Sequence, residues 1–163
     1  QGAKQFEYMA DYLTQNGFEH YEISNFAKPG FYSKHNSNYW KGKSYIGLGP
    51  SAHSYNGNNR QWNIGNNAEY IRRINTSAVW FEKEELSTET RYNEYVMTSL
   101  RTQWGCDLNV VKNQFGEKLH DYLLQQATPY IQFDKLLYNQ KKLQLSSSGK
   151  LIADKIASDL FWI

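Results

Sequence analysis

The sequence lacks several features that mark common classes of protein. Its 163 residues contain a single cysteine, Cys106, so they form neither an internal disulfide nor a cage of cysteine ligands around a metal. No apolar run approaches the length of a membrane-spanning helix, and the first residues do not resemble a signal peptide. The 18 basic and 16 acidic residues nearly balance, so bulk charge does not favour nucleic-acid binding. These absences predict a cytoplasmic protein with no transmembrane segment and no nucleic-acid partner.

Apolar and aromatic residues, by contrast, are plentiful. Hydrophobic residues make up 40% of the chain, which is enough for a packed core. Aromatics reach 16%, with thirteen Tyr and five Trp, whose apolar rings and polar tips suit half-wet clefts and interfaces as well as cores. Residue 1 is Gln, and helical periodicity begins almost at once. We therefore expect this chain to be a piece of a longer protein.

The first half of the chain alternates helical and extended patterns. Apolar residues repeat at the spacing of one helix face at Phe6, Met9, Ala10 and Leu13. Asn16-Gly17 then gives a helix stop. The elements expected next are a strand over 20–26, a loop or helical turn over 31–43, a buried strand over 44–48, a surface loop over 56–67 and a helix over 68–74. This order predicts an α/β protein.

Helical patterns dominate the second half. Ser87 is predicted to cap a helix that ends near Trp104-Gly105, and Glu89 suits its positive start. The remaining expected elements are helices over 108–114 and 117–126, hairpin arms over 130–137 and 142–145, and a terminal helix from residue 149. This order resembles a winged-helix module.

The stretch from Tyr21 to Tyr55 is the most distinctive part of the sequence. It contains Y-E-I-S-N-F-A, then H-N-x-x-Y-W at residues 35–40, then Y-I-G-L-G-P-S-A-H-S at residues 45–54. In order and spacing these motifs resemble the closing segment of the barrel in HemW-like haem chaperones. That radical SAM family is related to oxygen-independent coproporphyrinogen III oxidases. The C-terminal LSSSGKLIADKIASDLF, residues 145–161, is similar to the final domain of the family.

The resemblance implies an α/β fold in two parts. Residues 1–82 would be the C-terminal end of an incomplete radical SAM (β/α) barrel, and residues 83–163 a small winged-helix-like α+β domain of the HemN C-terminal type. Radical SAM chemistry needs three cysteines, in C-x-x-x-C-x-x-C, to hold a 4Fe–4S cluster that binds S-adenosylmethionine, and one cysteine cannot supply them. We therefore expect the cluster loop in an N-terminal part of the parent protein, and no catalysis by this fragment alone.

The H-N-x-x-Y-W motif has two interpretations on physical grounds. Neutral imidazole is a good axial ligand for haem iron, and a helix would place His35 and Tyr39 one turn apart on one face. Alternatively, His35 and Asn36 satisfy loop backbone groups while Tyr39 and Trp40 fill a core. The resemblance favours the first: it implies that His35, Asn36, Tyr39 and Trp40 bind haem, with His35 on the iron.

The small-residue loop of residues 47–54 also has two interpretations. Glycines let the backbone approach a ligand closely, but the loop matches no nucleotide-binding motif, and a tight structural turn explains it equally well. By resemblance, this loop borders the S-adenosylmethionine site through Gly47, Gly49, Ser51, Ala52 and His53. His53 is otherwise an ordinary hydrogen-bonded histidine. Glu22 faces a polar barrel interior or is a satisfied structural carboxylate.

Three functions follow from these features. The leading hypothesis is a parent protein that binds haem and delivers it to apo-haemoproteins, with a 4Fe–4S cluster and S-adenosylmethionine in support; peripheral membrane association stays open. The alternative is radical oxidative decarboxylation of coproporphyrinogen III. The third, a DNA-binding winged helix, is disfavoured because residues 117–126 carry Glu117 and Asp121 against a single lysine, Lys118.

Overall fold

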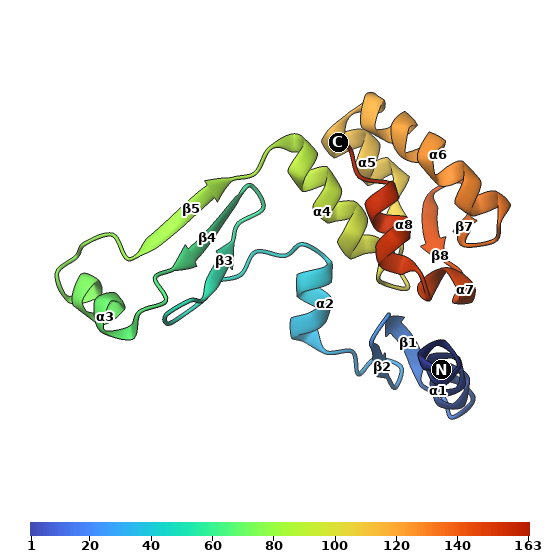
Figure 1. Cartoon of the computed structure of the whole chain (residues 1–163), viewed down its shortest axis with the longest axis horizontal. Helices are drawn as coiled ribbons and strands as arrows, with labels where there is room; N and C mark the ends of the chain where they lie inside the picture. The colour runs from blue at the N-terminus through green and yellow to red at the C-terminus, as the bar shows by residue number, and fades with distance from the viewer.

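A computed structural model describes residues 1–163, and the chain is elongated (Figure 1). Residues 86–163 form a helical lobe. Residues 45–85 form a sheet arm that extends away from this lobe, and residues 1–44 lie between and beside the two (Figure 1). None of the helices combines the length and the apolar character that a membrane crossing requires.

The chain begins with helix α1 (Gly2–Gln15) and an antiparallel hairpin of β1 (Glu19–Glu22) and β2 (Asn25–Ala27). The prediction of a single strand over 20–26 was therefore wrong, because the region forms two strands joined by a turn. The physical reason is local: the carboxylate of Glu22 accepts hydrogen bonds from the Ser24 backbone N–H at 3.0 Å and from the Asn25 side chain, which closes a turn inside the expected strand.

Helix α2 (Lys34–Trp40) occupies the region predicted as a loop or helical turn. Ser33 caps its start by accepting a hydrogen bond from the Asn36 N–H at 3.3 Å. The end of α2 is closed by Gly42, which adopts φ +60° and donates its N–H to the Tyr39 carbonyl at 3.0 Å. The Lys43 N–H returns to the Asn38 carbonyl at 2.9 Å, completing a Schellman turn in which glycine takes the left-handed position.

The sheet arm consists of β3 (His53–Tyr55), β4 (Asn59–Asn63) and β5 (Phe81–Glu85), all antiparallel, with α3 (Asn67–Asn75) at its far end (Figure 1). The helix predicted over 68–74 is confirmed. The buried strand predicted over 44–48 was wrong: only Tyr45 forms a bridge, to Tyr55, and Ile46 and Leu48 are 82% and 87% exposed.

The loop predicted over 56–67 was also wrong in part, because its residues 59–63 form β4, the central strand of the arm. Asn and Arg have little tendency to form strands on their own. Here two neighbouring strands supply the hydrogen-bond partners, and this context overrides the propensity.

The helical lobe follows the predicted order of elements with two differences. It contains α4 (Thr88–Leu100), β6 (Cys106–Asp107), α5 (Leu108–Phe115), α6 (Glu117–Gln132), β7 (Leu136–Tyr138), β8 (Lys142–Leu145), α7 (Ser147–Lys150) and α8 (Ala153–Asp159). The short strand β6 was not predicted, and the predicted terminal helix is divided into α7 and α8. Ser87 caps α4 as predicted, accepting from the Thr90 N–H at 3.1 Å. Helix α6 continues through Pro129 to Gln132, so the first residues of the predicted hairpin arm are helical. Burial of one face of α6 favours the continuation of the helix in spite of Pro129, which lacks a backbone N–H.

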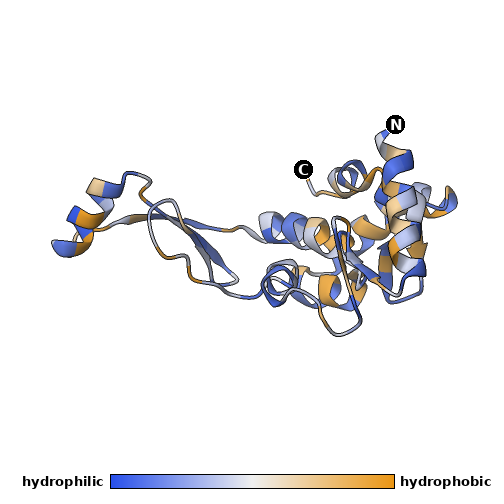
Figure 2. Cartoon of the chain, turned by 90° about the horizontal axis from the view of Figure 1, so that it is seen from below, coloured by the Kyte–Doolittle hydropathy of each residue, from blue (hydrophilic) through white to orange (hydrophobic).

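The connected hydrophobic core lies within the helical lobe. Its sixteen buried residues fall between Tyr92 and Leu160 and include the fully buried Cys106. Figure 2 shows hydrophobic positions in α3 as well as in the lobe. Those in and after α3 are not covered: Ile71, Ile74 and Val79 are 58%, 43% and 62% exposed.

Candidate functional site

Helix α2 separates the residues of the H-N-x-x-Y-W motif onto two faces. Lys34, His35, Asn38 and Tyr39 are exposed, while Asn36 and Trp40 are partly buried and Ser37 is buried. His35 and Tyr39 stand four residues apart, which places them one turn apart on the exposed face. The structure therefore brings together two of the four predicted haem contacts, and turns Asn36 and Trp40 inward.

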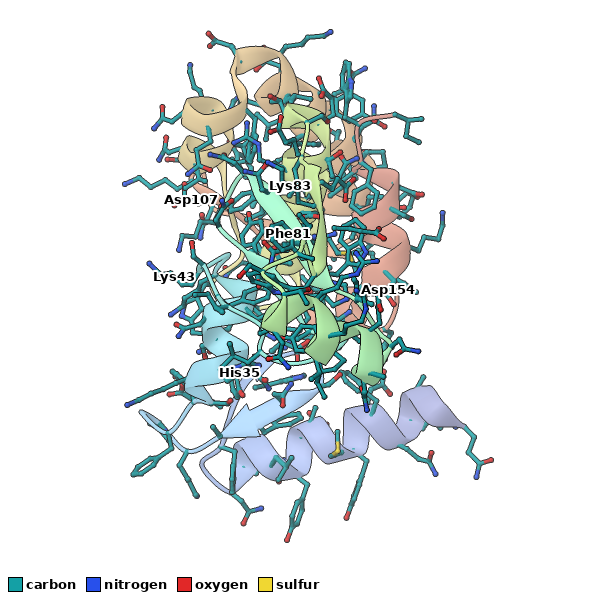
Figure 3. The ribbon with its side chains drawn as sticks, turned by 90° about the vertical axis from the view of Figure 1, so that its left-hand side faces the viewer. His35, Lys43, Phe81, Lys83, Asp107 and Asp154 are labelled. Atoms are coloured by element: carbon teal, nitrogen blue, oxygen red, sulfur yellow. The ribbon has the colours of Figure 1, made fainter.

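The exposed face carries a free imidazole. His35 forms no hydrogen bond or ion pair with another residue, and Figure 3 shows it on the surface of the α2 segment. The Tyr39 ring is 50% exposed and meets Trp40 edge-on, with ring centres 5.0 Å apart. An accessible ring nitrogen next to a half-exposed aromatic surface is a chemistry that suits a flat, iron-containing macrocycle.

The inward face of α2 attaches the helix to the rest of the chain. The Arg101 guanidinium lies over the Trp40 ring, 5.2 Å from its centre, and the Asn36 amide donates to the Asn25 side chain at 3.4 Å. The Ser37 hydroxyl is buried without a hydrogen-bond partner. Trp40 and Asn36 therefore hold α2 in position, and this leaves the opposite face open.

Glu22, which the sequence placed beside a cofactor or in a structural role, is buried next to the helical lobe. Its exposed fraction is 2%, and its carboxylate accepts from Arg101 Nε at 3.1 Å. Arg101 also pairs with the exposed Asp154 at 2.9 Å. This geometry suits the satisfied structural carboxylate, and it separates Glu22 from the small-residue loop.

Arg101 is the residue that sequence reasoning missed. It contacts Glu22, Trp40 and Asp154, and its carbonyl accepts from the Ile23 N–H at 3.0 Å. It lies 79 residues from Glu22 in the chain, and no local pattern connects the two. The only signal was a lone arginine directly after an amphipathic helix.

The hairpin meets the lobe at a second point as well. Lys150 of α7 approaches the His20 ring, with 3.1 Å between Nζ and Nδ1, and the His20 ring stacks on Phe26. Burial lowers the pKa of both His20 and Lys150 from their usual values. The His20 ring is therefore neutral and packed between other residues, so it is not accessible to a ligand.

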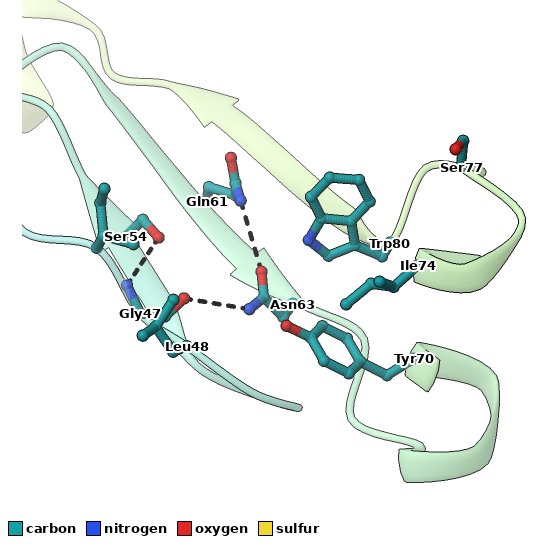
Figure 4. Close-up of a pocket in the computed structure, with 10 residues that line it drawn as sticks. Gly47, Leu48, Ser54, Gln61, Asn63, Tyr70, Ile74, Ser77 and Trp80 are labelled. Carbon is teal, nitrogen blue, oxygen red and sulfur yellow. Dashed lines mark hydrogen bonds between the residues drawn. The ribbon is translucent and has the colours of Figure 1, made fainter. Parts of the chain in front are cut away.

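The small-residue loop forms one wall of a cavity in the sheet arm. The cavity is about 440 Å³ and lies between residues 46–48, β4 and α3 (Figure 4). The Asn63 amide donates to the carbonyls of Gly47 at 3.3 Å and Gly49 at 2.9 Å, and the Gly49 N–H donates to the Tyr70 hydroxyl at 3.3 Å. A side chain at Gly47 would overlap the backbone of His53. The loop is therefore pinned to β4 and α3.

The remaining residues predicted beside a cofactor lie on this same loop. Ser51 has φ +59° and is exposed. The Ala52 N–H donates to the Gly49 carbonyl, and the Ala52 carbonyl accepts from the Asn63 N–H. The exposed His53 ring stands 6.4 Å from that of Trp62. Five of the six residues predicted beside a cofactor therefore lie together on this loop. The sixth, Glu22, lies apart from them, next to Arg101.

The donor set of this chain fits haem and does not fit an iron–sulfur cluster. His35 offers one accessible axial ligand, while no group of three or more His, Cys, Asp or Glu side chains stands ready for a metal ion. Cys106 is fully buried, and burial raises the pKa of its thiol to about 12, so it is not available as a thiolate.

Comparisons with known proteins agree with these observations. The model of the HemN C-terminal domain matches residues 86–152. "Heme chaperone HemW" of Lactococcus lactis is 34% identical over 148 residues, or 90% of this chain and 38% of that protein. The protein of the same name from Bacillus subtilis is 31% identical over 158 residues, or 96% of this chain and 41% of that protein.

A solved structure shares the fold. It is described as "Coproporphyrinogen III oxidase (HemN) from Escherichia coli is a Radical SAM enzyme", and it superposes with a TM-score of 0.70 at 19% identity, over 95% of this chain and 39% of that chain. The predicted α/β class is confirmed at this level. The chain spans about two-fifths of the length of the relatives it matches. The chain is therefore similar to a C-terminal portion of HemW proteins, and its residues 86–152 match the model of the HemN C-terminal domain.

Proposed function

We propose that the protein to which this chain belongs binds haem on α2 and delivers it to apo-haemoproteins in the cytoplasm. The observation that carries the proposal is the unpartnered His35 imidazole, which shares an exposed helix face with Tyr39. Two relatives that match 90% or more of the chain are named heme chaperones, which supports the same function.

The openness of the site suits transfer better than storage. A haem held by one imidazole on an exposed face keeps its second axial position accessible. A recipient protein could then supply its own ligand to the iron before the bond to His35 breaks, so the haem would not have to be released into water. The Tyr39 ring would cover one part of the macrocycle. Trp40, which packs edge-on against Tyr39, would hold that ring in place.

The architecture of the parent protein forms the second part of the proposal. Residues 1–82 would close a radical SAM barrel whose cluster and S-adenosylmethionine site lie outside this chain, with the loop of residues 47–53 at its border. Residues 83–163 would be a winged-helix-like domain. The order of helix α4, strand β6, helices α5 and α6, and strands β7 and β8 supports this assignment.

A haem titration tests the proposed function. Ferric haem is added to the 163-residue chain under anaerobic conditions, and the Soret band is followed to saturation, beside a His35→Ala variant. We expect the variant to bind at least about tenfold more weakly, a loss of about 1.4 kcal/mol, because it lacks the iron ligand.

The matched control is His120→Gln, which removes a histidine of α6 that pairs with Asp121 in the helical lobe. This control should bind haem like the unmodified chain. Equal affinity of the unmodified chain and His35→Ala would contradict the proposal, because binding would then come from other residues or from aromatic surface in general.

A further inference from the structure

Charge is unevenly distributed along the chain, although the totals nearly balance. Residues 23–68 contain no Asp or Glu and five basic residues: Lys28, Lys34, Lys41, Lys43 and Arg60. The remaining residues carry 13 basic against 16 acidic side chains. The segment that carries α2 thus has a net positive charge, while the rest of the chain is slightly acidic.

Three of the five cations already have partners within the structure. Lys28 donates to the Asn16 carbonyl at 2.6 Å and lies over the Phe18 ring. Lys41 lies over the Trp104 ring, 4.1 Å from its centre, and Arg60 pairs with Glu94. The charges of these three residues therefore have structural roles within the chain.

Lys34 and Lys43 have no such partner: both are exposed, and neither forms an ion pair, a side-chain hydrogen bond or a contact with an aromatic ring. The position of Lys34 is also unfavourable for the helix. It occupies the first turn of α2, where the helix dipole is positive, and no acidic residue balances it there. A charge that opposes the helix dipole costs some stability, and costs of this kind are found at functional sites.

The Schellman turn brings Lys43 to the same helix. Because its N–H is bonded to the Asn38 carbonyl, the backbone of Lys43 folds back onto the last turn of α2. Lys34 adjoins His35, and Asn38 follows Lys34 by four residues, a rise of about 6 Å. Figure 3 shows His35 and Lys43 on the side of the view opposite Asp154. Lys34 and Lys43 therefore stand at the two ends of the short helix whose exposed face carries His35 and Tyr39.

We propose that Lys34 and Lys43 bind the two propionate carboxylates of a haem whose iron is held by His35. This inference rests on the proposed function and adds how the site recognises the charged edge of its ligand. Haem has a flat apolar body with two anionic side chains on one edge. A face with one imidazole, one half-exposed ring and two unpaired lysines matches these features in kind and in number.

The experiment compares two probes that differ only at the carboxylates: ferric haem and its dimethyl ester, which has no negative propionate. Each is titrated against the unmodified 163-residue chain, Lys34→Gln/Lys43→Gln, and the control Lys4→Gln/Lys141→Gln, which loses the same charge at exposed positions away from α2. Circular dichroism confirms that all three are folded.

We expect Lys34→Gln/Lys43→Gln to bind haem about three- to tenfold more weakly, which is the range for two exposed ion pairs. The same variant should bind the dimethyl ester as tightly as the unmodified chain does. Lys34→Arg/Lys43→Arg should retain the affinity for haem, and added salt should weaken the binding of haem but not of the ester.

The outcomes separate this inference from the proposed function. If the lysine pair is replaced without effect while His35→Ala abolishes binding, the propionate contacts are overturned and the haem site stands. If both probes lose affinity equally, the lysines act on the fold or on the surface and not on carboxylates, which also overturns the inference. If the unmodified chain binds haem no better than His35→Ala does, both proposals fail.

Discussion

Arg101 illustrates how single residues hold this chain together. Its guanidinium pairs with the buried Glu22, covers Trp40 and reaches Asp154, so one side chain connects the hairpin, α2 and α8. Glu22 has 1% of its side chain exposed, whereas Asp154 has 84% exposed. Both carboxylates pair with Arg101, but the Glu22 carboxylate is buried and the Asp154 carboxylate is in solvent. We therefore expect the two ion pairs to contribute different amounts to stability.

We predict that Glu22→Gln lowers the free energy of unfolding by about 1–3 kcal/mol, below the range for fully buried pairs because Arg101 is partly exposed. Asp154→Asn, the matched control, should change it by less than about 1 kcal/mol. Urea denaturation of each variant measures both. Equal, small losses for the two variants would show that burial does not strengthen the Glu22 pair.

At the scale of elements, glycines decide how closely two segments approach. Gly149 of α7 lies against the backbone of Lys135, which precedes β7, and an added Cβ would overlap the Lys135 carbonyl. Gly2, at the start of α1, has open space around the position of a Cβ. The first glycine is required by packing and the second is not.

Gly149→Ala should therefore destabilise the helical lobe by about 2–3 kcal/mol, since α7 or the Lys135 segment must shift to relieve the overlap. Gly2→Ala should be neutral or slightly stabilising, because alanine favours a helix. Thermal unfolding followed by circular dichroism compares the two. An unchanged midpoint for Gly149→Ala would mean that the close approach is not maintained in solution.

The elements also show which parts of the fold were predictable from sequence. Helices with an apolar face and a cap, such as α4 after Ser87, were located within a few residues because their signal is local. Strand β4 was missed because its residues are polar and its partners lie in β3 and β5. Helix α2 falls in the region predicted as a loop or helical turn, but the inward turn of Trp40 could not be predicted, because its contact Arg101 lies 61 positions later in the chain.

At the scale of the whole molecule, stability is concentrated at one end. All sixteen core residues belong to the helical lobe, while the sheet arm keeps apolar side chains such as Leu48 and Ile71 exposed. Few buried contacts hold the arm, so its local opening should cost much less free energy than unfolding of the lobe.

We predict that brief trypsin treatment cuts the arm first, at exposed basic residues such as Arg72 or Lys83. The lobe should persist as a fragment that ends at Ile163. Intact-mass measurement of the digest identifies the cut sites. Early cleavage inside the lobe, for example after Arg91 or Lys118, would contradict this distribution of stability.

Strand β5 gives the arm a further property through its composition. It is the outer strand of its sheet and reads Phe-Glu-Lys-Glu-Glu, with the last four residues exposed. If two copies met along this edge, their glutamates would come close together and repel one another. The edge therefore discourages the chain from stacking on itself into larger aggregates, while a partner with a basic strand would meet no such barrier.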